Sequence, residues 1–208
     1  MRAESMSAGC LCIDDITSGT SDPSGPFLFR GLSGVETWPF RCPEGENLWD
    51  GLRVALQALR KRWETVGVAA QGTGCAAALA LAEQLPVDRL ALVDPLLSIR
   101  GTGRGGGAMS ADARVLRRIA AFARRNLSLC VSDTLIVETG ADCVDCRRLA
   151  DALSTHCRVE RIRFDVKTGE KLYKIREIEV KQAISRFLQA GERQKPLAEN
   201  PEMCIIYG

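Results

Sequence analysis

The chain has 208 residues, of which 46% are hydrophobic and 26% charged, the balance of one globular domain with a substantial core. Its formal net charge is only +2, which argues against electrostatic attraction to nucleic acid or to acidic membranes. Aromatic residues make up 5% and no basic stretch is interleaved with them, so a stacking platform for nucleic acid is not expected. We therefore expect neither nucleic acid nor a membrane surface as a partner.

The chain has nine cysteines, an odd number without the even, close spacing of a disulfide framework. Several lie inside apolar runs, where cysteine behaves as a small buried hydrophobe; these are Cys10, Cys12, Cys75 and Cys130. The N-terminal apolar run is too short for a signal peptide, and no stretch of about 18 apolar residues predicts a membrane span. This cysteine usage predicts a reducing, cytoplasmic location.

The first elements in chain order are two short extended segments and a helix. Apolar residues 8–13 predict a buried strand, and residues 26–30 a second extended piece. A helix is expected over residues 47–63, with Asn47 as its cap and Asp50 three positions later, as in a capping box. Its apolar stripe has helical spacing and consists of Leu48, Trp49, Leu52, Ala55, Leu56, Leu59 and Trp63.

Residues 66–95 predict a strand, a sharp turn, a helix and a second strand. The apolar run 66–70 meets a tight turn of sequence QGTG at residues 71–74. An alanine-rich helix follows over residues 74–84. A second apolar run, residues 90–93, then ends at an Asp-Pro pair.

The second half of the chain continues this alternation after a glycine-rich connector. The expected elements, in order, are the connector 99–109, a helix over 110–126, a strand over 134–137, a helix over 143–155, a strand over 159–166 and a helix over 176–190. Strands that alternate with helices of this length predict the α/β class, with a mostly parallel sheet covered by helices on both faces. We expect one domain over residues 1–192 and an irregular tail over 193–208, its apolar end 204–207 included.

Two turns resemble motifs of the α/β-hydrolase superfamily. Residues 70–74 (AQGTG) resemble the nucleophile elbow, G-x-S-x-G, which presents a serine from a strained strand-to-helix bend. Residues 13–21 (IDDITSGTS) resemble the end of the fourth family strand, D-x-x-G-x-G-x-S, and match it at Asp14, Gly19 and Ser21.

A third segment, residues 134–142 (TLIVETGAD), resembles the strand and loop that carry the family's triad acid. Asp142 falls close to the position of that acid. An N-cap role for the helix that starts at Cys143 is the alternative interpretation of Asp142. The three segments occur in the family's order, and the resemblance implies an α/β-hydrolase-like core.

The chain departs from the family at the positions of the catalytic residues. Gly72 occupies the nucleophile position, and residues 168–174 (TGEKLYK), where the triad histidine is expected, contain none. The one histidine is His156. If residues 8–13 are the fourth family strand, the core lacks the family's N-terminal strands and the loop that supplies half of the oxyanion hole. The first strand would then be a sheet edge, covered by residues 26–41, a second copy of the chain or another protein partner.

These observations predict an α/β-hydrolase-fold protein without Ser-His-Asp catalysis. Its expected role is to bind a small apolar ligand at the carboxyl ends of the strands, or a protein partner. The main alternative is a hydrolase or acyltransferase whose nucleophile is Cys75 or Thr73. We expect no cofactor and no metal site.

A second alternative is a thiol redox protein that uses Cys143 and Cys146. A CxxC pair at a helix N-terminus favours the thiolate of its first cysteine, and the surrounding segment resembles a thioredoxin-type strand, loop and helix. Two cysteines are too few for a zinc site.

Overall fold

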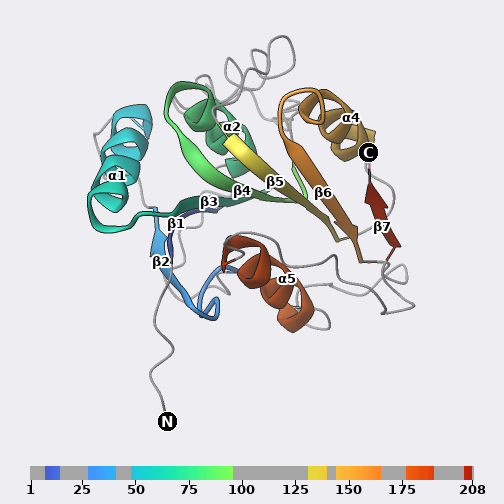
Figure 1. Cartoon of the computed structure of the whole chain (residues 1–208), viewed down its shortest axis with the longest axis horizontal. Coiled ribbons are helices and arrows are strands. Elements are labelled where there is room, and N and C mark those ends of the chain that lie inside the picture. Colours follow the sequence, from blue (N-terminus) through green and yellow to red (C-terminus); the bar gives the residue numbers. More distant parts are fainter. Residues whose placement is uncertain are drawn as a thin grey trace, which may run out of the picture.

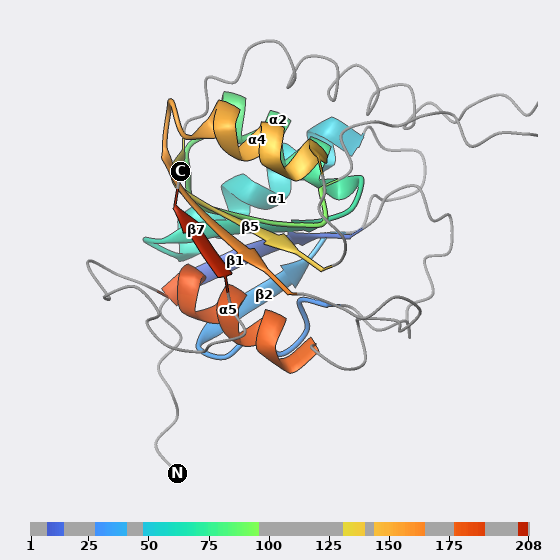
Figure 2. The same ribbon diagram turned by 90° about the vertical axis from the view of Figure 1, so that its right-hand side faces the viewer.

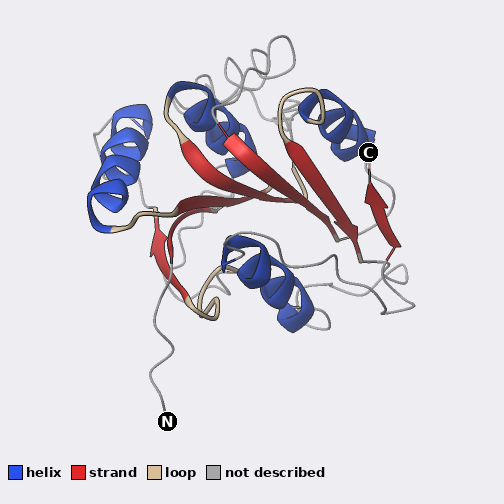
Figure 3. Cartoon of the chain, viewed as in Figure 1, coloured by secondary structure: helices blue, strands red, loops and turns tan. Residues whose placement is uncertain are grey.

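The computed structural model describes residues 8–14, 28–40, 48–95, 131–139, 144–164, 177–189 and 204–207. Within these ranges one sheet forms the central layer, with helices on both sides (Figures 1 and 3). Its strands are β1 (Ala8–Ile13), β2 (Val35–Pro39), β3 (Val66–Gln71), β4 (Val87–Val93), β5 (Val131–Glu138), β6 (Arg158–Arg163) and β7 (Cys204–Tyr207). Their order is β2-β1-β3-β4-β5-β6-β7. Strands β1 to β6 run parallel, and β7 pairs with β6 in the antiparallel sense, which confirms the predicted α/β class.

Four helices are described, and they cover the two faces unequally. Helices α1 (Leu48–Arg62), α2 (Gly74–Gln84) and α4 (Val144–Leu153) lie on one face, and α5 (Glu177–Gln189) lies on the other (Figures 1 and 2). Two separate apolar cores result, one on each side of the sheet. The central parallel strands are buried on both faces, which explains why their sequences are continuous apolar runs. No described helix has the length and apolar character needed to cross a bilayer.

Strand β2 covers the outer side of β1, so residues 8–13 are not an edge. Its residues 35–39 pair in parallel with residues 8–12, which confirms for these residues the cover expected from the 26–41 segment. The extended piece expected over 26–30 is wrong where it is described, because residues 28–31 form turns. Strand β2 is thus the outermost strand on this side, and its free side is protected from pairing with a further strand. Phe40 donates its N–H to the carbonyl oxygen of Cys12, so Pro39, which has no N–H, faces outward.

Several strands begin earlier than the apolar pattern predicts. Strand β4 starts at Val87 and β5 at Val131, each three residues before its apolar run. The added residues include polar ones that are held by specific contacts, such as Asp88 and Asp133. The N–H of Val66 donates to the carboxylate of Asp88 over 2.7 Å, and this contact joins β3 to β4.

The helix predictions agree more closely. The helix predicted over residues 74–84 has those bounds in the structure, and the others differ by one or two residues. The tail prediction is wrong for residues 204–207, which form β7 because the neighbouring edge of β6 offers a partner strand. The connector 99–109 and the helix expected over 110–126 lie outside the described residues.

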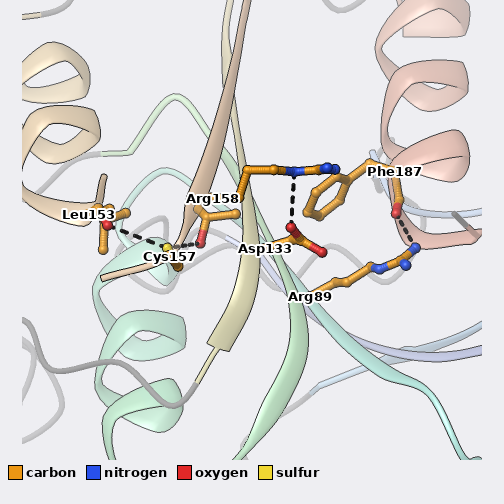
Figure 4. A network of polar contacts seen from close by, with 7 residues as sticks. Arg89, Asp133, Leu153, Cys157, Arg158 and Phe187 are labelled. Atoms are coloured by element: carbon orange, nitrogen blue, oxygen red, sulfur yellow. Dashed lines mark hydrogen bonds and ion pairs between the residues drawn. The ribbon is translucent and has the colours of Figure 1, made fainter. Parts of the chain in front are cut away.

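Charged side chains gather at the amino ends of β4, β5 and β6 (Figure 4). Arg158 pairs with Asp133 over 3.1 Å. Arg89 donates to the carbonyl oxygen of Phe187 in α5. Burial lowers the pKa of Arg89, and the nearby Asp133 carboxylate opposes that shift. Contacts at this edge of the sheet, where the parallel strands begin and which we call the amino edge, therefore hold α5 in place.

Candidate functional site at the carboxyl edge of the sheet

The elbow-like turn expected at residues 70–74, called the elbow from here on, joins β3 to α2. Gly72 has φ +56°, a left-handed conformation that most side chains disfavour. Its N–H donates to the carbonyl oxygen of Val93 over 3.0 Å, which ties the turn to the end of β4. Helix α2 starts directly afterwards, with the N–H of Ala76 donating to the carbonyl oxygen of Thr73 over 3.2 Å.

Gly74 brings the start of α2 against the end of β1. A Cβ atom there would lie 2.5 Å from the carbonyl oxygen of Asp14 and 2.9 Å from that of Ile13. Both obstacles are backbone atoms, so neither can move aside easily. The second glycine of the elbow-like sequence is thus required by close packing of helix on strand.

The packing places β1 between two strands. Strand β1 pairs with the elbow strand β3 on one side and with β2 on the other. The chain that follows β1 begins beside the elbow at Asp14. Of the segment 13–21, which resembles the end of the fourth family strand, residues 15–21 lie outside the described ranges.

The two alternative nucleophiles do not face outward. Thr73 is 5% exposed and Cys75 is fully buried. The Cys75 Sγ lies 3.3 Å from the carbonyl oxygen of Ala70 and 3.6 Å from that of Val93. Both atoms belong to strands beneath the turn, so this thiol points into the protein.

His156 lies at the opposite edge of the sheet from the elbow. It is an exposed residue in the turn between α4 and β6, two residues before Arg158, where β6 begins, and so it lies near the amino end of a parallel strand. The elbow follows the carboxyl end of β3, which is parallel to β6. The single histidine of the chain is thereby separated from Gly72 by the length of the sheet.

Asp94 lies at the same edge of the sheet and was not singled out by the sequence pattern. It directly follows β4 and has φ +45°, a strained conformation for a residue other than glycine. The Thr139 N–H donates to its Oδ1 over 2.7 Å, and the Thr139 hydroxyl donates to Oδ2. Burial raises the pKa of Asp94, and the two bonds from Thr139 only partly offset this. The one available signal was an Asp-Pro pair at the end of an apolar strand.

Of the remaining candidates Asp142, Cys143 and Cys146, the structure describes Cys146. Asp142 and Cys143 lie outside the described residues. Cys146 is fully buried on α4. Arg161 forms a buried ion pair with Glu138 at the end of β5. In the described part of the chain, no three His, Cys, Asp or Glu side chains are grouped as metal ligands would be.

Two solved structures with a similar architecture are described as an esterase domain and as lipolytic enzymes. An esterase domain from a Rhodothermus marinus protein has 15% sequence identity over 90% of this chain and 90% of its own, with a TM-score of 0.58. The structure reported for LipS and LipT, two metagenome-derived lipolytic enzymes, has 13% identity over 89% of this chain and 94% of its own, with a TM-score of 0.63. No protein-family model and no curated protein matches the sequence. At these identities the likeness shows the fold, which is α/β-hydrolase-like.

Proposed function

We propose that this protein binds a small, partly apolar ligand at the carboxyl edge of its sheet and does not hydrolyse esters through a Ser-His-Asp triad. The observation that carries the proposal is the presence of Gly72 at the centre of the elbow, with φ +56°. A glycine offers no oxygen or sulfur for covalent catalysis. Acyl transfer needs a nucleophile and a base within hydrogen-bond reach of each other.

The position of His156 supports the proposal that the elbow has no histidine base beside it. It lies at the amino edge, before β6, whereas the elbow lies at the carboxyl edge. A serine placed at position 72 would therefore still have no histidine from its own chain to take its proton.

The buried state of the neighbouring thiol and hydroxyl argues against a substitute nucleophile. Cys75 is oriented toward backbone carbonyls beneath the turn, and Thr73 is nearly inaccessible. A thiolate at Cys75 would lose its stabilising donor role and face two carbonyl oxygens. We therefore place the hydrolase alternative below the binding role.

Three features favour a ligand site at this edge. Open α/β sheets bind ligands outside the carboxyl ends of their strands. The ends of β3 and β4 are apolar up to Ala70 and Val93. Asp94, a strained and partly buried carboxylate, then follows directly, and strained residues and shifted pKa values gather at functional sites.

A partner that adds a strand to the β2 edge is the less favoured binding role. Pro39 faces outward there, and Arg62 pairs with Glu36 over 3.3 Å and lies over the Trp38 ring. Charged groups and proline at an edge oppose strand addition. A second copy of the chain on this edge is opposed by the same features.

Hydrolysis of p-nitrophenyl butyrate and labelling by a fluorophosphonate probe test the proposal. We expect neither above the level of heat-denatured protein. The Gly72→Ser variant should remain inactive, because the base is absent and not only the nucleophile. Turnover by the native protein that is lost in Cys75→Ala or Thr73→Ala would overturn the proposal. Heat released on titration with octanol, below its solubility limit, tests for the apolar ligand site directly.

A further inference from the structure

Two cysteine thiols lie side by side on β1. Cys10 and Cys12 are alternate residues of this strand, so their side chains point to the same face of the sheet. Their Sγ atoms lie 3.9 Å apart, and both side chains are fully buried. Both belong to the apolar core on the α5 side of the sheet. The pair is therefore a dithiol that the proposed ligand site does not use.

The surroundings of the pair favour uncharged species. The Cys10 Sγ lies 3.7 Å from the carbonyl oxygen of Leu11, and the Cys12 Sγ lies 3.6 Å from that of Cys10. Burial, and then the neighbouring Cys10, raise the pKa of Cys12, and among the described residues no lysine or arginine lowers it. Because a charge without a partner is costly in an apolar core, a ligand should enter this site without charge and leave none behind.

A direct disulfide fits this pair poorly. Residues two apart on a strand have Cα atoms roughly 6.6 Å apart, near the upper limit that a disulfide spans. Strand β1 is paired with β2 and with β3 over both cysteines, which keeps it extended. A bridge through one atom is less demanding, because bonds of about 2.3 Å from each sulfur together span up to about 4.6 Å. The sulfur separation of 3.9 Å lies within that reach.

The bridging atom must be satisfied by two sulfurs and must leave no net charge. Zinc usually takes four ligands, and in the described ranges no third His, Cys, Asp or Glu joins these two cysteines. Copper(I) accepts thiolates, but with two of them it carries a net negative charge. Trivalent arsenic meets both conditions, because arsenous acid is uncharged at neutral pH and bonds to two thiols with loss of water.

We infer that Cys10 and Cys12 form a binding site for trivalent arsenic, in which one arsenic atom bridges the two sulfurs. In this step two S–H bonds and two As–O bonds break, two As–S bonds form, and two water molecules leave. The arsenic keeps its third hydroxyl group and its oxidation state, so no oxidant or reductant is needed. Neither Gly72 nor an apolar ligand takes part, and the site is therefore independent of the proposed function.

The cover over the sulfurs should determine how fast arsenic enters. Four apolar residues that precede or begin β2 belong to the same core as the two cysteines: Leu28, Phe29, Leu32 and Val35. Since both sulfurs are fully buried, the adduct forms only when part of this core opens. Uptake should therefore be slow in buffer and faster in urea below the unfolding transition.

Equilibrium dialysis against arsenite at pH 7, with glutathione present to compete for arsenic, tests the site. The starting protein is Cys143→Ser, which breaks the other close pair in the sequence, Cys143 and Cys146. We expect it to retain one arsenic atom per chain. Adding Cys12→Ala should lower the affinity on the order of 100-fold, because the second As–S bond is no longer intramolecular. Adding Cys75→Ala instead removes a single buried thiol from the other core and should leave the affinity unchanged.

Localisation of the arsenic keeps the test decisive if a variant fails to fold. Trypsin releases fragment 3–30, which contains Cys10, Cys12 and no other cysteine. We expect the arsenic of the Cys143→Ser protein on this fragment. Arsenic on another fragment, an unchanged affinity in Cys12→Ala, or no retention by Cys143→Ser would each overturn the inference. Equal losses of affinity in the Cys12→Ala and Cys75→Ala proteins would also overturn it, since a single thiol would then serve as well as the pair.

Discussion

Arg89 on β4 donates a hydrogen bond of 2.6 Å to the carbonyl oxygen of Phe187 in the last turn of α5. The same guanidinium lies 6.0 Å from the centroid of the Phe187 ring, within reach of a cation–π interaction. The last carbonyl groups of a helix have no partner within the helix. Arg89 thus caps α5 from the sheet, and it couples that helix to the amino edge (Figure 4).

We predict that Arg89→Met lowers the free energy of unfolding by about 1–2 kcal/mol, through loss of one charge-assisted hydrogen bond and the ring contact. Methionine keeps much of the aliphatic stem. Arg158→Met is the matched control, because its ion pair with Asp133 involves a side chain that is 73% exposed and should contribute less than about 1 kcal/mol. Urea unfolding of both variants measures the difference. Equal losses would show that Arg89 acts only as a surface charge.

Replacement of Gly72 should lower the free energy of unfolding by an amount that depends on the residue introduced. At φ +56°, we expect Gly72→Ala to destabilise the protein by about 1–2 kcal/mol. Asparagine tolerates the left-handed region better, so Gly72→Asn should cost less than Gly72→Ala. Thermal unfolding of the pair checks this. Equal stability of the two variants would mean that steric contact, and not the φ angle, determines which residues position 72 tolerates.

Gly74 and Gly67 offer a second comparison, in which both added Cβ atoms meet an obstacle at 2.5 Å. At Gly74 the obstacle is the backbone oxygen of Asp14, and at Gly67 it is the flexible side chain of Leu188. We predict that Gly74→Ala costs roughly 3 kcal/mol, the upper part of the range for overpacking, and Gly67→Ala nearer 1 kcal/mol. Chemical denaturation measures both. A smaller loss in Gly74→Ala than in Gly67→Ala would contradict the rigid contact between α2 and β1.

The pH dependence of stability should carry a signature of Asp94. Burial raises its pKa above the ordinary value of 3.8, so the folded state binds the proton more tightly than the unfolded state. Its stabilising contribution is therefore full below the unfolded pKa and is lost as the pH rises through the folded pKa. Relative to Asp94→Asn, the native protein should gain stability as the pH falls from neutral toward about 4. Thermal unfolding of both proteins across this range tests the sign. A difference that is flat or falls in acid would mean that Thr139 outweighs burial.

Local sequence patterns predicted most of the sheet, but they could not predict contacts between residues that are far apart in the sequence. The Gly74–Gln84 helix was predicted with its bounds because an alanine-rich run follows a glycine turn. Strand β2 was missed because Val35–Pro39 mixes charged, aromatic and proline residues, as suits a half-buried edge. Gly72 lies in the turn, and Cys75 is buried in the first turn of α2. Asp94 was missed because its role depends on Thr139, which lies 45 residues later and meets it only once β4 and β5 pair.

The last prediction concerns thiol reactivity and the redox alternative. Cys10, Cys12, Cys75 and Cys146 are fully buried, and burial raises the pKa of Cys12 and, to a smaller degree, that of the half-buried Cys157. All five should therefore react slowly with iodoacetamide at neutral pH, since the thiolate is the reactive form. Cys143 lies outside the described residues, but α4 begins at the next residue, and a helix N-terminus favours a thiolate.

We expect quantitative mass spectrometry of the alkylated protein to place Cys143 among the fastest thiols, with Cys146 among the slowest. Denatured protein, in which the intrinsic differences between the sites are small, serves as the control. If Cys143 reacts no faster than Cys10, the helix does not activate it and the redox alternative should be dropped. If Cys143 is fast but oxidised glutathione leaves a stable mixed disulfide on Cys143, with no second glutathione released and no Cys143–Cys146 disulfide formed, the pair has no exchange chemistry and Cys146 serves only as a core residue.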